Sequence, residues 1–150
     1  FPYTTLFRSL PPMSAWMILR GMKTLDMRMK KHCENGLAVA EFLEEEENVE
    51  LVKYPALKSH PQYELCKTQM NGLGGGVVSF KLKDGINGLT RDQASRRLMN
   101  SLELATIATS LGEEHTLVQM NGENLIRIAV GLESSNDIIN DFKQAIEKLK

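Results

Sequence analysis

The sequence has no long apolar run, few cysteines and almost no net charge. No stretch approaches the roughly 18 apolar residues that cross a membrane. The start shows no basic region followed by an apolar block and a small-residue cleavage site. We therefore expect neither a membrane protein nor a secreted one. The net charge is -1, with both signs interspersed along the chain, so no basic stripe indicates a nucleic-acid partner.

The two cysteines, Cys33 and Cys66, do not suggest a disulfide framework or a metal site. Both lie in predicted helices, they form no Cys-x-x-Cys spacing, and no histidine cluster joins them. We expect free thiols and a cytoplasmic protein. A chain of 150 residues that is 42% hydrophobic and 25% charged is typical of one globular domain with a core.

Apolar residues recur at steps of three and four from Ile18 to Leu43. This spacing predicts a single helix of more than about 25 residues, with Ser14 as a candidate N-cap. Such a length suggests a helix that crosses from one domain to another. A second apolar stripe predicts a last helix that begins near Ser134 and runs to Leu149.

Four short strands are predicted, at residues 49–54, 77–83, 104–108 and 125–131. Between them, helices are predicted after Ser59-His60-Pro61 and at the capping box formed by Thr90 and Gln93. This order favours an α+β fold. We expect a long N-terminal helix followed by a mostly antiparallel sheet of about four strands, covered by helices on one face.

Arg127 interrupts the otherwise apolar run from Leu125 to Gly131. Alternation places Arg127 on one face of the strand and Ile126 and Ile128 on the packed face. A guanidinium stays charged, so burying it without an anion is costly, whereas a carboxylate can meet its planar fork with two hydrogen bonds. The run therefore predicts a residue that binds an acid. The alternative is an arginine that lies along an open sheet face with its stem on its neighbours.

Several short sequence motifs carry information beyond the predicted helices and strands. They are Trp16 to Leu25 with Arg28 and His32 to Asn35, then Tyr54-Pro55, Ser59-His60-Pro61, Gln69-Met70, Gly72 to Gly76, Ser79-Phe80, Ser110 to Gly112, and Leu125 to Gly131 with Glu133. From Met13 to Lys150 the chain resembles the Cys/Met-metabolism family of pyridoxal-phosphate (PLP) enzymes. That family includes cystathionine γ-synthase, cystathionine lyases and methionine γ-lyase.

The resemblance implies that residues 10–150 are the small C-terminal, substrate-side domain of a fold-type I PLP enzyme whose large cofactor domain is absent. The family's Schiff-base lysine belongs to that absent domain, and no lysine here stands in a Ser-x-Thr-Lys setting. We therefore expect no catalytic residue in this chain and no activity from it alone. Residues 1–9 join no pattern and resemble the translation of a sequencing adapter, so they are expected to be a non-native leader.

By position, the resemblance implies that Arg127 binds the substrate α-carboxylate. It places Ser110 and Leu111 in the loop beside the cofactor and substrate, although a plain turn would also explain this loop. Arg20 and Lys23 also match the family and are expected to brace the interdomain helix.

The implied parent is a PLP-dependent carbon-sulfur lyase or γ-replacement transferase of the transsulfuration type. It acts on a small sulfur-containing amino acid, namely methionine, cystathionine or homocysteine, and assembles as a homotetramer. The alternative is a stand-alone amino-acid-binding or regulatory α+β module without cofactor.

The chain departs from the family between Leu117 and Leu125, where the family usually carries a longer segment. His115 stands at the start of this shortened link, and we expect an exposed loop residue with no catalytic role. The residues that choose between β and γ chemistry, and between elimination and replacement, lie largely in the absent domain. The substrate therefore stays open at this point.

Overall fold

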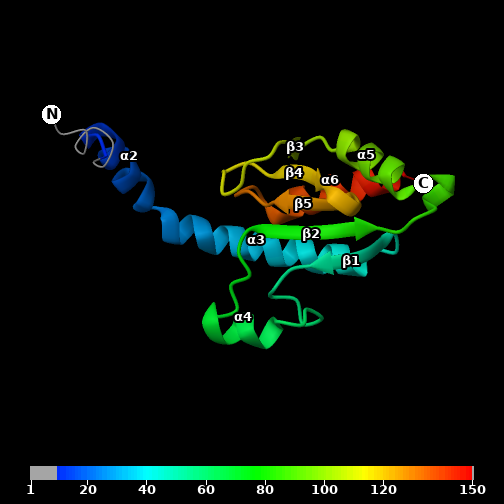
Figure 1. The fold of residues 1–150 in the computed structure, drawn as a ribbon, viewed down its shortest axis with the longest axis horizontal. Helices are drawn as coiled ribbons and strands as arrows, with labels where there is room; N and C mark the ends of the chain where they lie inside the picture. The colour runs from blue at the N-terminus through cyan, green and yellow to red at the C-terminus, as the bar shows by residue number, and fades with distance from the viewer. Residues whose placement is uncertain (1–9, 150) are drawn as a thin grey trace.

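The computed structural model describes residues 10–149 (Figure 1), and the expected leader at residues 1–9 lies outside them. Helices α2 (Pro12–Met22) and α3 (Leu25–Glu45) precede a five-stranded sheet of order β1-β2-β5-β4-β3. The other elements are β1 (Val49–Lys53), α4 (Tyr63–Gln69), β2 (Val77–Leu82), η1 (Ile86–Gly88), α5 (Arg91–Ser101), β3 (Thr106–Ile107), β4 (Leu117–Asn121), η2 (Gly122–Asn124), β5 (Leu125–Ala129) and α6 (Ser135–Glu147). The α+β class is confirmed.

One face of the sheet is packed against helices. The strands pair antiparallel except β3 and β4, which run parallel. Val78 and Phe80 of β2 lie opposite Ile128 and Ile126 of β5, and all four are fully buried. Residues of α3, α5 and α6 join them in one hydrophobic core. The predicted helical layer is therefore present, and Arg127 lies on the sheet face away from it.

The prediction of one unbroken N-terminal helix is wrong. The helix is interrupted at Lys23 and Thr24, where Arg28 donates to the carbonyl oxygen of Gly21 at 2.8 Å and to the hydroxyl of Thr24 at 3.3 Å. Glycine and threonine both have low helix propensity, and the arginine satisfies a carbonyl group that the break leaves free. Ser14 is not an N-cap either, because α2 begins before it.

The sheet has five strands, one more than the predicted number of about four. The shortened link after Leu117 is itself β4, which forms a hairpin with β5. The hairpin is closed by η2, where Glu123 and Asn124 adopt positive φ angles of 64° and 57°. Polar residues such as Gln119 weaken the local strand pattern, and pairing with β5 decides the conformation. The predicted strand at 104–108 forms only at Thr106–Ile107.

Tyr54 fills the space between α3 and the glycine-rich segment that precedes β2. Its side chain is fully buried, and its hydroxyl points at the carbonyl oxygens of Cys33, at 3.2 Å, and Gly75, at 2.9 Å. A Cβ atom at Gly74 would lie 2.5 Å from the tyrosine ring. Gly74 therefore serves close packing, as the position of the glycines before a strand predicted, whereas Gly75 adopts a positive φ of 82° in open space.

Burial raises the pKa of Tyr54 above its ordinary value of 10.0, and the neighbouring thiols of Cys33 and Cys66 add to the shift. The stability that comes from this raised pKa is fully present below the unfolded pKa of about 10 and is lost as the pH rises further. We expect the free energy of unfolding, measured by urea denaturation and circular dichroism, to fall as the pH rises above about 10. Tyr54→Phe should reduce this fall and Tyr63→Phe should not. An identical pH dependence in both variants would contradict the expectation.

Candidate functional site

Strand β5 positions Arg127 at the centre of the sheet. Its register partners are Ser79 on β2 and Gln119 on β4. Its sequence neighbours Ile126 and Ile128 are fully buried on the opposite, helix-covered face. The alternation predicted for this strand is thus confirmed.

The guanidinium of Arg127 reaches the loop between β3 and β4. Its Nη2 donates to the carbonyl oxygen of Thr109 at 2.8 Å and to that of Ser110 at 3.2 Å. Its Nε is buried and has no hydrogen-bond partner among the residues that the structure describes. Among residues 10–149, no carboxylate lies within ion-pair distance of Arg127. Within this part of the chain, the half-buried cation is therefore uncompensated.

The loop residues named from the sequence lie beside this cation. The structure brings Ser110 and Arg127 together through the serine carbonyl group, whereas the serine hydroxyl donates to Glu113 at 2.8 Å. The side chain of Leu111 is 59% exposed. His115 is exposed too, as expected. The contact between this loop and β5 is thus made through backbone carbonyl groups.

Sequence reasoning missed the polar residues that fix the two ends of this region. Thr116 is fully buried and binds the carboxylate of Glu133. Asn35 and His32 of α3 contact the chain just after β5. Such partners are far apart in sequence, so no local pattern reports them. The matched strings contained Glu133, His32 and Asn35, but they did not show that these residues contact one another's segments.

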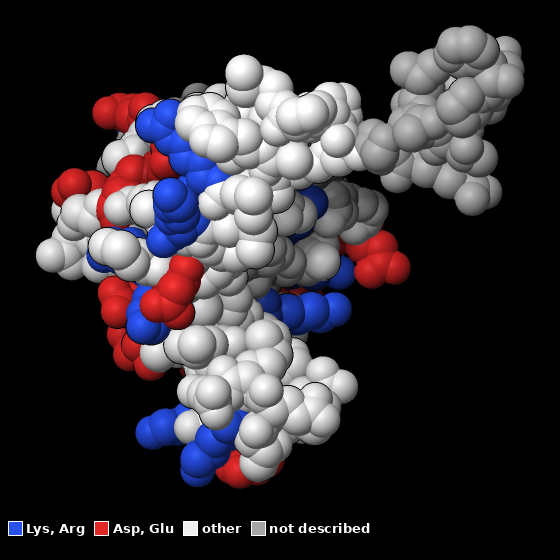
Figure 2. Space-filling model, turned by 90° about the vertical axis from the view of Figure 1, so that its left-hand side faces the viewer, with Lys and Arg blue, Asp and Glu red and all other residues white. Residues whose placement is uncertain are grey.

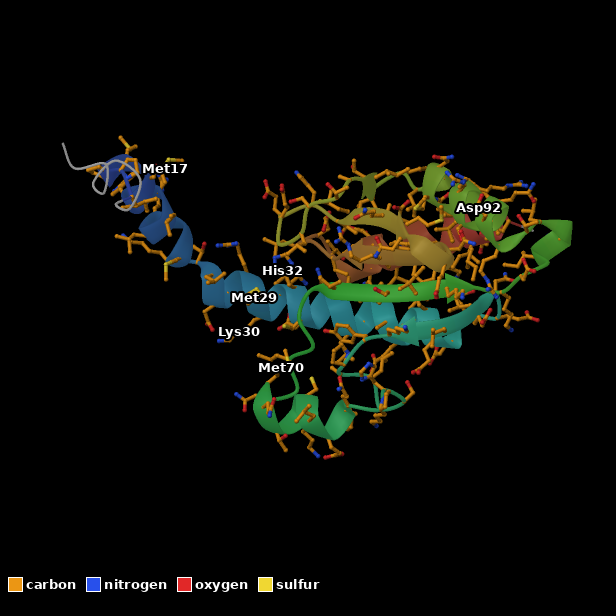
Figure 3. The ribbon with its side chains drawn as sticks, viewed as in Figure 1. Met17, Met29, Lys30, His32, Met70 and Asp92 are labelled. Atoms are coloured by element: carbon orange, nitrogen blue, oxygen red, sulfur yellow. The ribbon has the colours of Figure 1, made fainter. Side chains whose placement is uncertain are left out.

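Helix α2 extends beyond the end of the sheet at which the β3–β4 loop lies (Figure 1). None of its residues is buried. Its exposed apolar side chains include Trp16, Met17 and Leu19, and Met17 is labelled on this protruding helix in Figure 3. From this end, uncharged surface occupies much of the centre of the view (Figure 2). A helix that is apolar around its whole circumference is normally enclosed by other structure.

Among residues 10–149, the contacts of the two residues expected to brace this helix are local. The guanidinium of Arg20 lies 5.6 Å from the ring centre of Trp16, within α2 itself. Lys23 stands at the C-terminal end of α2. Within residues 10–149, neither Arg20 nor Lys23 contacts the region around Arg127.

The described residues do not fit the attachment of a pyridoxal cofactor. Such attachment needs a lysine at the substrate site. Lys30 pairs with Asp26, Lys148 pairs with Glu103, and no lysine between residues 10 and 149 bonds to the loop at Ser110. This same part of the chain holds no group of His, Cys, Asp and Glu side chains suited to a metal ion. What the described residues present at this site is the guanidinium of Arg127.

Within residues 10–149, none of the helices has the length and hydropathy of a membrane span. Cys33 and Cys66 are both free thiols, as predicted.

Comparison with known proteins finds one family and several relatives from that family. Residues 5–123 match the family described as Cys/Met metabolism PLP-dependent enzyme. The chain is 45% identical over 159 residues to an L-methionine gamma-lyase of Treponema denticola, which covers 94% of this chain and 38% of that protein. It is 38% identical to a cystathionine gamma-lyase of Bos taurus, over 91% of this chain and 36% of that protein. The chain therefore spans less than two fifths of the length of these relatives.

Solved structures show the same similarity. A putative O-acetylhomoserine (thiol)-lyase of Campylobacter jejuni superposes with a TM-score of 0.84 at 35% identity, over 96% of this chain and 34% of that one. That structure contains N'-pyridoxyl-lysine-5'-monophosphate. A cystathionine gamma-lyase from yeast superposes with a TM-score of 0.81 at 34% identity, over 92% of this chain and 39% of that one.

Proposed function

Because the chain belongs to the Cys/Met metabolism family of PLP-dependent enzymes, we propose that residues 10–150 are the C-terminal, substrate-side part of such an enzyme. Arg127 then binds the α-carboxylate of the amino-acid substrate. The observation that carries this proposal is the half-buried guanidinium of Arg127, which has no carboxylate partner among residues 10–149. A substrate carboxylate supplies the missing countercharge.

An arginine suits this task better than a lysine. Its planar fork can form two parallel hydrogen bonds to one carboxylate and so fixes the orientation of the ligand as well as its affinity. Nη2 already donates to the carbonyl groups of Thr109 and Ser110, so a two-pronged carboxylate contact, which always includes Nη2, replaces one of these two bonds. These bonds hold the guanidinium plane in place before a ligand arrives, which lowers the ordering cost of binding.

We assign the cofactor and its lysine to a further domain of the parent enzyme, which this chain does not contain. The relatives are much longer than the chain, and the exposed apolar surface of α2 lies at the same end of the molecule as the loop beside Arg127. A second domain that encloses α2 would meet the Arg127 site there. In a stand-alone module, the apolar surface around α2 would stay exposed to solvent, which is unfavourable.

The proposed parent is a carbon-sulfur lyase or γ-replacement enzyme of sulfur amino-acid metabolism. Its substrate is a small sulfur-containing amino acid, for which the names of the treponemal and bovine relatives are the support. We further propose that it works in the cytoplasm as a homotetramer.

The role of Arg127 can be tested in a chimera in which residues 13–149 of this chain replace the aligned region of the treponemal L-methionine gamma-lyase. Arg127→Lys is expected to lower kcat/KM for L-methionine by more than about tenfold, or about 1.4 kcal/mol, because a lysine cannot form the two-pronged contact. The measurement is steady-state kinetics of the purified chimera.

Arg97→Lys in the same chimera is the matched control, because Arg97 is exposed on α5. It should change kcat/KM by less than about twofold, in line with most surface substitutions. If Arg127→Lys is as active as Arg97→Lys, Arg127 does not hold the substrate.

A further inference from the structure

A carboxylate joins the end of β5 to the start of β4. The Oε1 atom of Glu133 accepts a hydrogen bond from the backbone N–H of Thr116 at 2.6 Å, and its Oε2 accepts one from the Thr116 hydroxyl at 2.9 Å. The same hydroxyl oxygen accepts a hydrogen bond from the backbone N–H of Gly131 at 3.0 Å. Thr116 is fully buried. One carboxylate therefore fixes one residue through both its backbone and its side chain, with charge-assisted bonds.

Helix α3 holds the same segment from the other side. Asn35 donates to the carbonyl oxygens of Gly131 at 3.0 Å and Glu133 at 2.8 Å. His32 points from α3 toward the sheet (Figure 3), and its Nδ1 donates to the carbonyl oxygen of Val130 at 2.7 Å. A Cβ atom at Gly131 would lie 2.5 Å from the carbonyl oxygen of the loop residue before His115 and 2.3 Å from the Glu133 carboxylate. The turn after β5 is thus packed closely against the loop, with no room for a side chain at Gly131.

These contacts fix the far end of the loop that Arg127 binds. Arg127 holds the loop where it leaves β3, through the carbonyl groups of Thr109 and Ser110. Glu133 holds the loop where it enters β4, through Thr116. Both anchoring side chains come from β5 or the turn that follows it. The position of the loop relative to the guanidinium therefore depends on both anchors.

We propose that Thr116 and Glu133 are positioning residues for the carboxylate site at Arg127. Their contact keeps the loop carbonyl groups on the Nη2 side of the guanidinium, so that its remaining donors stay available for a ligand carboxylate. This inference rests on the proposed function of Arg127. Neither residue touches the ligand. A supporting contact of this kind matters because a small displacement of a binding group weakens its interaction strongly.

The first test uses the chain itself and needs no substrate. Hydrogen exchange of the loop amides at residues 109–115 and the side-chain Nε–Hε signal of Arg127 are measured by NMR. Thr116→Val removes the hydroxyl but keeps the shape of the side chain. It is expected to speed loop exchange by about tenfold and to shift or broaden the Arg127 signal. Thr116→Ser keeps the hydroxyl and should stay within about twofold of the parent chain.

Thr68→Val is the matched control, because the Thr68 hydroxyl bonds only to carbonyl groups within α4. If Thr116→Val matches Thr68→Val in both readouts, the proposal is overturned. If circular dichroism shows that Thr116→Val does not fold, Glu133→Gln is measured instead, by loop amide exchange and by the Arg127 signal. This variant removes the charge but keeps the side-chain length. An unchanged loop and Arg127 signal in that variant overturns the proposal.

The second test uses the chimera with the treponemal enzyme. Thr116→Val should raise KM for L-methionine by about three- to tenfold and leave kcat within about twofold, with recovery in Thr116→Ser. A lowered kcat with unchanged KM contradicts a role in positioning the carboxylate site. If Arg127→Lys has no effect in the chimera but Thr116→Val loosens the loop in the chain, the proposed function fails and the coupling between the two anchors stands.

Discussion

Replacing Phe142 with alanine is expected to lower the free energy of unfolding by about 3–5 kcal/mol. Phe142 lies on α6, is fully buried, and meets the ring of Phe80 on β2 edge to face, with ring centres 6.1 Å apart. Its removal leaves a cavity between the helical layer and the sheet that close-packed neighbours cannot fill. Because the same layer supports β2 and β5, this loss should also loosen the strand that carries Arg127.

Urea denaturation followed by far-ultraviolet circular dichroism measures this effect. Leu65→Ala is a suitable control, because Leu65 on α4 is 47% exposed and should cost less than about 1 kcal/mol. A loss of less than about 1 kcal/mol in Phe142→Ala would show that α6 does not pack on the sheet as described.

Replacing Asp141 with alanine is expected to destabilise the chain by about 3 kcal/mol or more. The Asp141 carboxylate is buried and accepts hydrogen bonds from the backbone N–H groups of Glu103 at 2.7 Å, Leu104 at 3.1 Å and Ala105 at 2.9 Å. Alanine leaves three donors without a charged acceptor, whose hydrogen bonds each contribute about 1.5–3 kcal/mol, and of the three residues Ala105 is itself buried. The segment they belong to leads directly into β3, a strand of only two residues.

Asp141→Ala should loosen the segment around residues 103–107 as well as lower the stability of the whole chain. Amide exchange at residues 103–107 should quicken more than exchange in β2, because the carboxylate orders this segment. Asp137→Ala is the control, since Asp137 is exposed in the first turn of the same helix, where an acidic residue contributes about 0.3–1 kcal/mol through the helix dipole. Equal losses in the two variants would contradict the role given to Asp141.

Local sequence patterns correctly predicted the buried face of a strand and the start of a helix. The alternation around Arg127 placed Ile126 and Ile128 on the buried face, and the capping box of Thr90 and Gln93 forms as predicted. These signals are local because burial imposes a period of two on a strand, and because a helix start satisfies its own backbone N–H groups.

The spacing of apolar residues did not predict two other features. The break at Lys23 and Thr24 interrupts an apolar period that continues across it, and Arg28 completes the turn. The strand at 117–121 is stabilised by pairing with β5, which its own composition does not reveal. At β4, pairing in the folded chain outweighs a weak local strand pattern. At the helix break, the low helix propensity of glycine and threonine outweighs the apolar period.

By itself, the sequence determined the class of the fold, the buried face of β5 and the likeness to PLP-dependent enzymes of Cys/Met metabolism. Only the tertiary structure decided what surrounds Arg127. It brought the carbonyl groups of Thr109 and Ser110 to the guanidinium, and it joined Glu133 to Thr116. The physical reason is that periodicity records which side of an element is buried. Hydrogen bonds between distant segments, such as that from His32 to Val130 across 98 positions, depend on how the elements pack together.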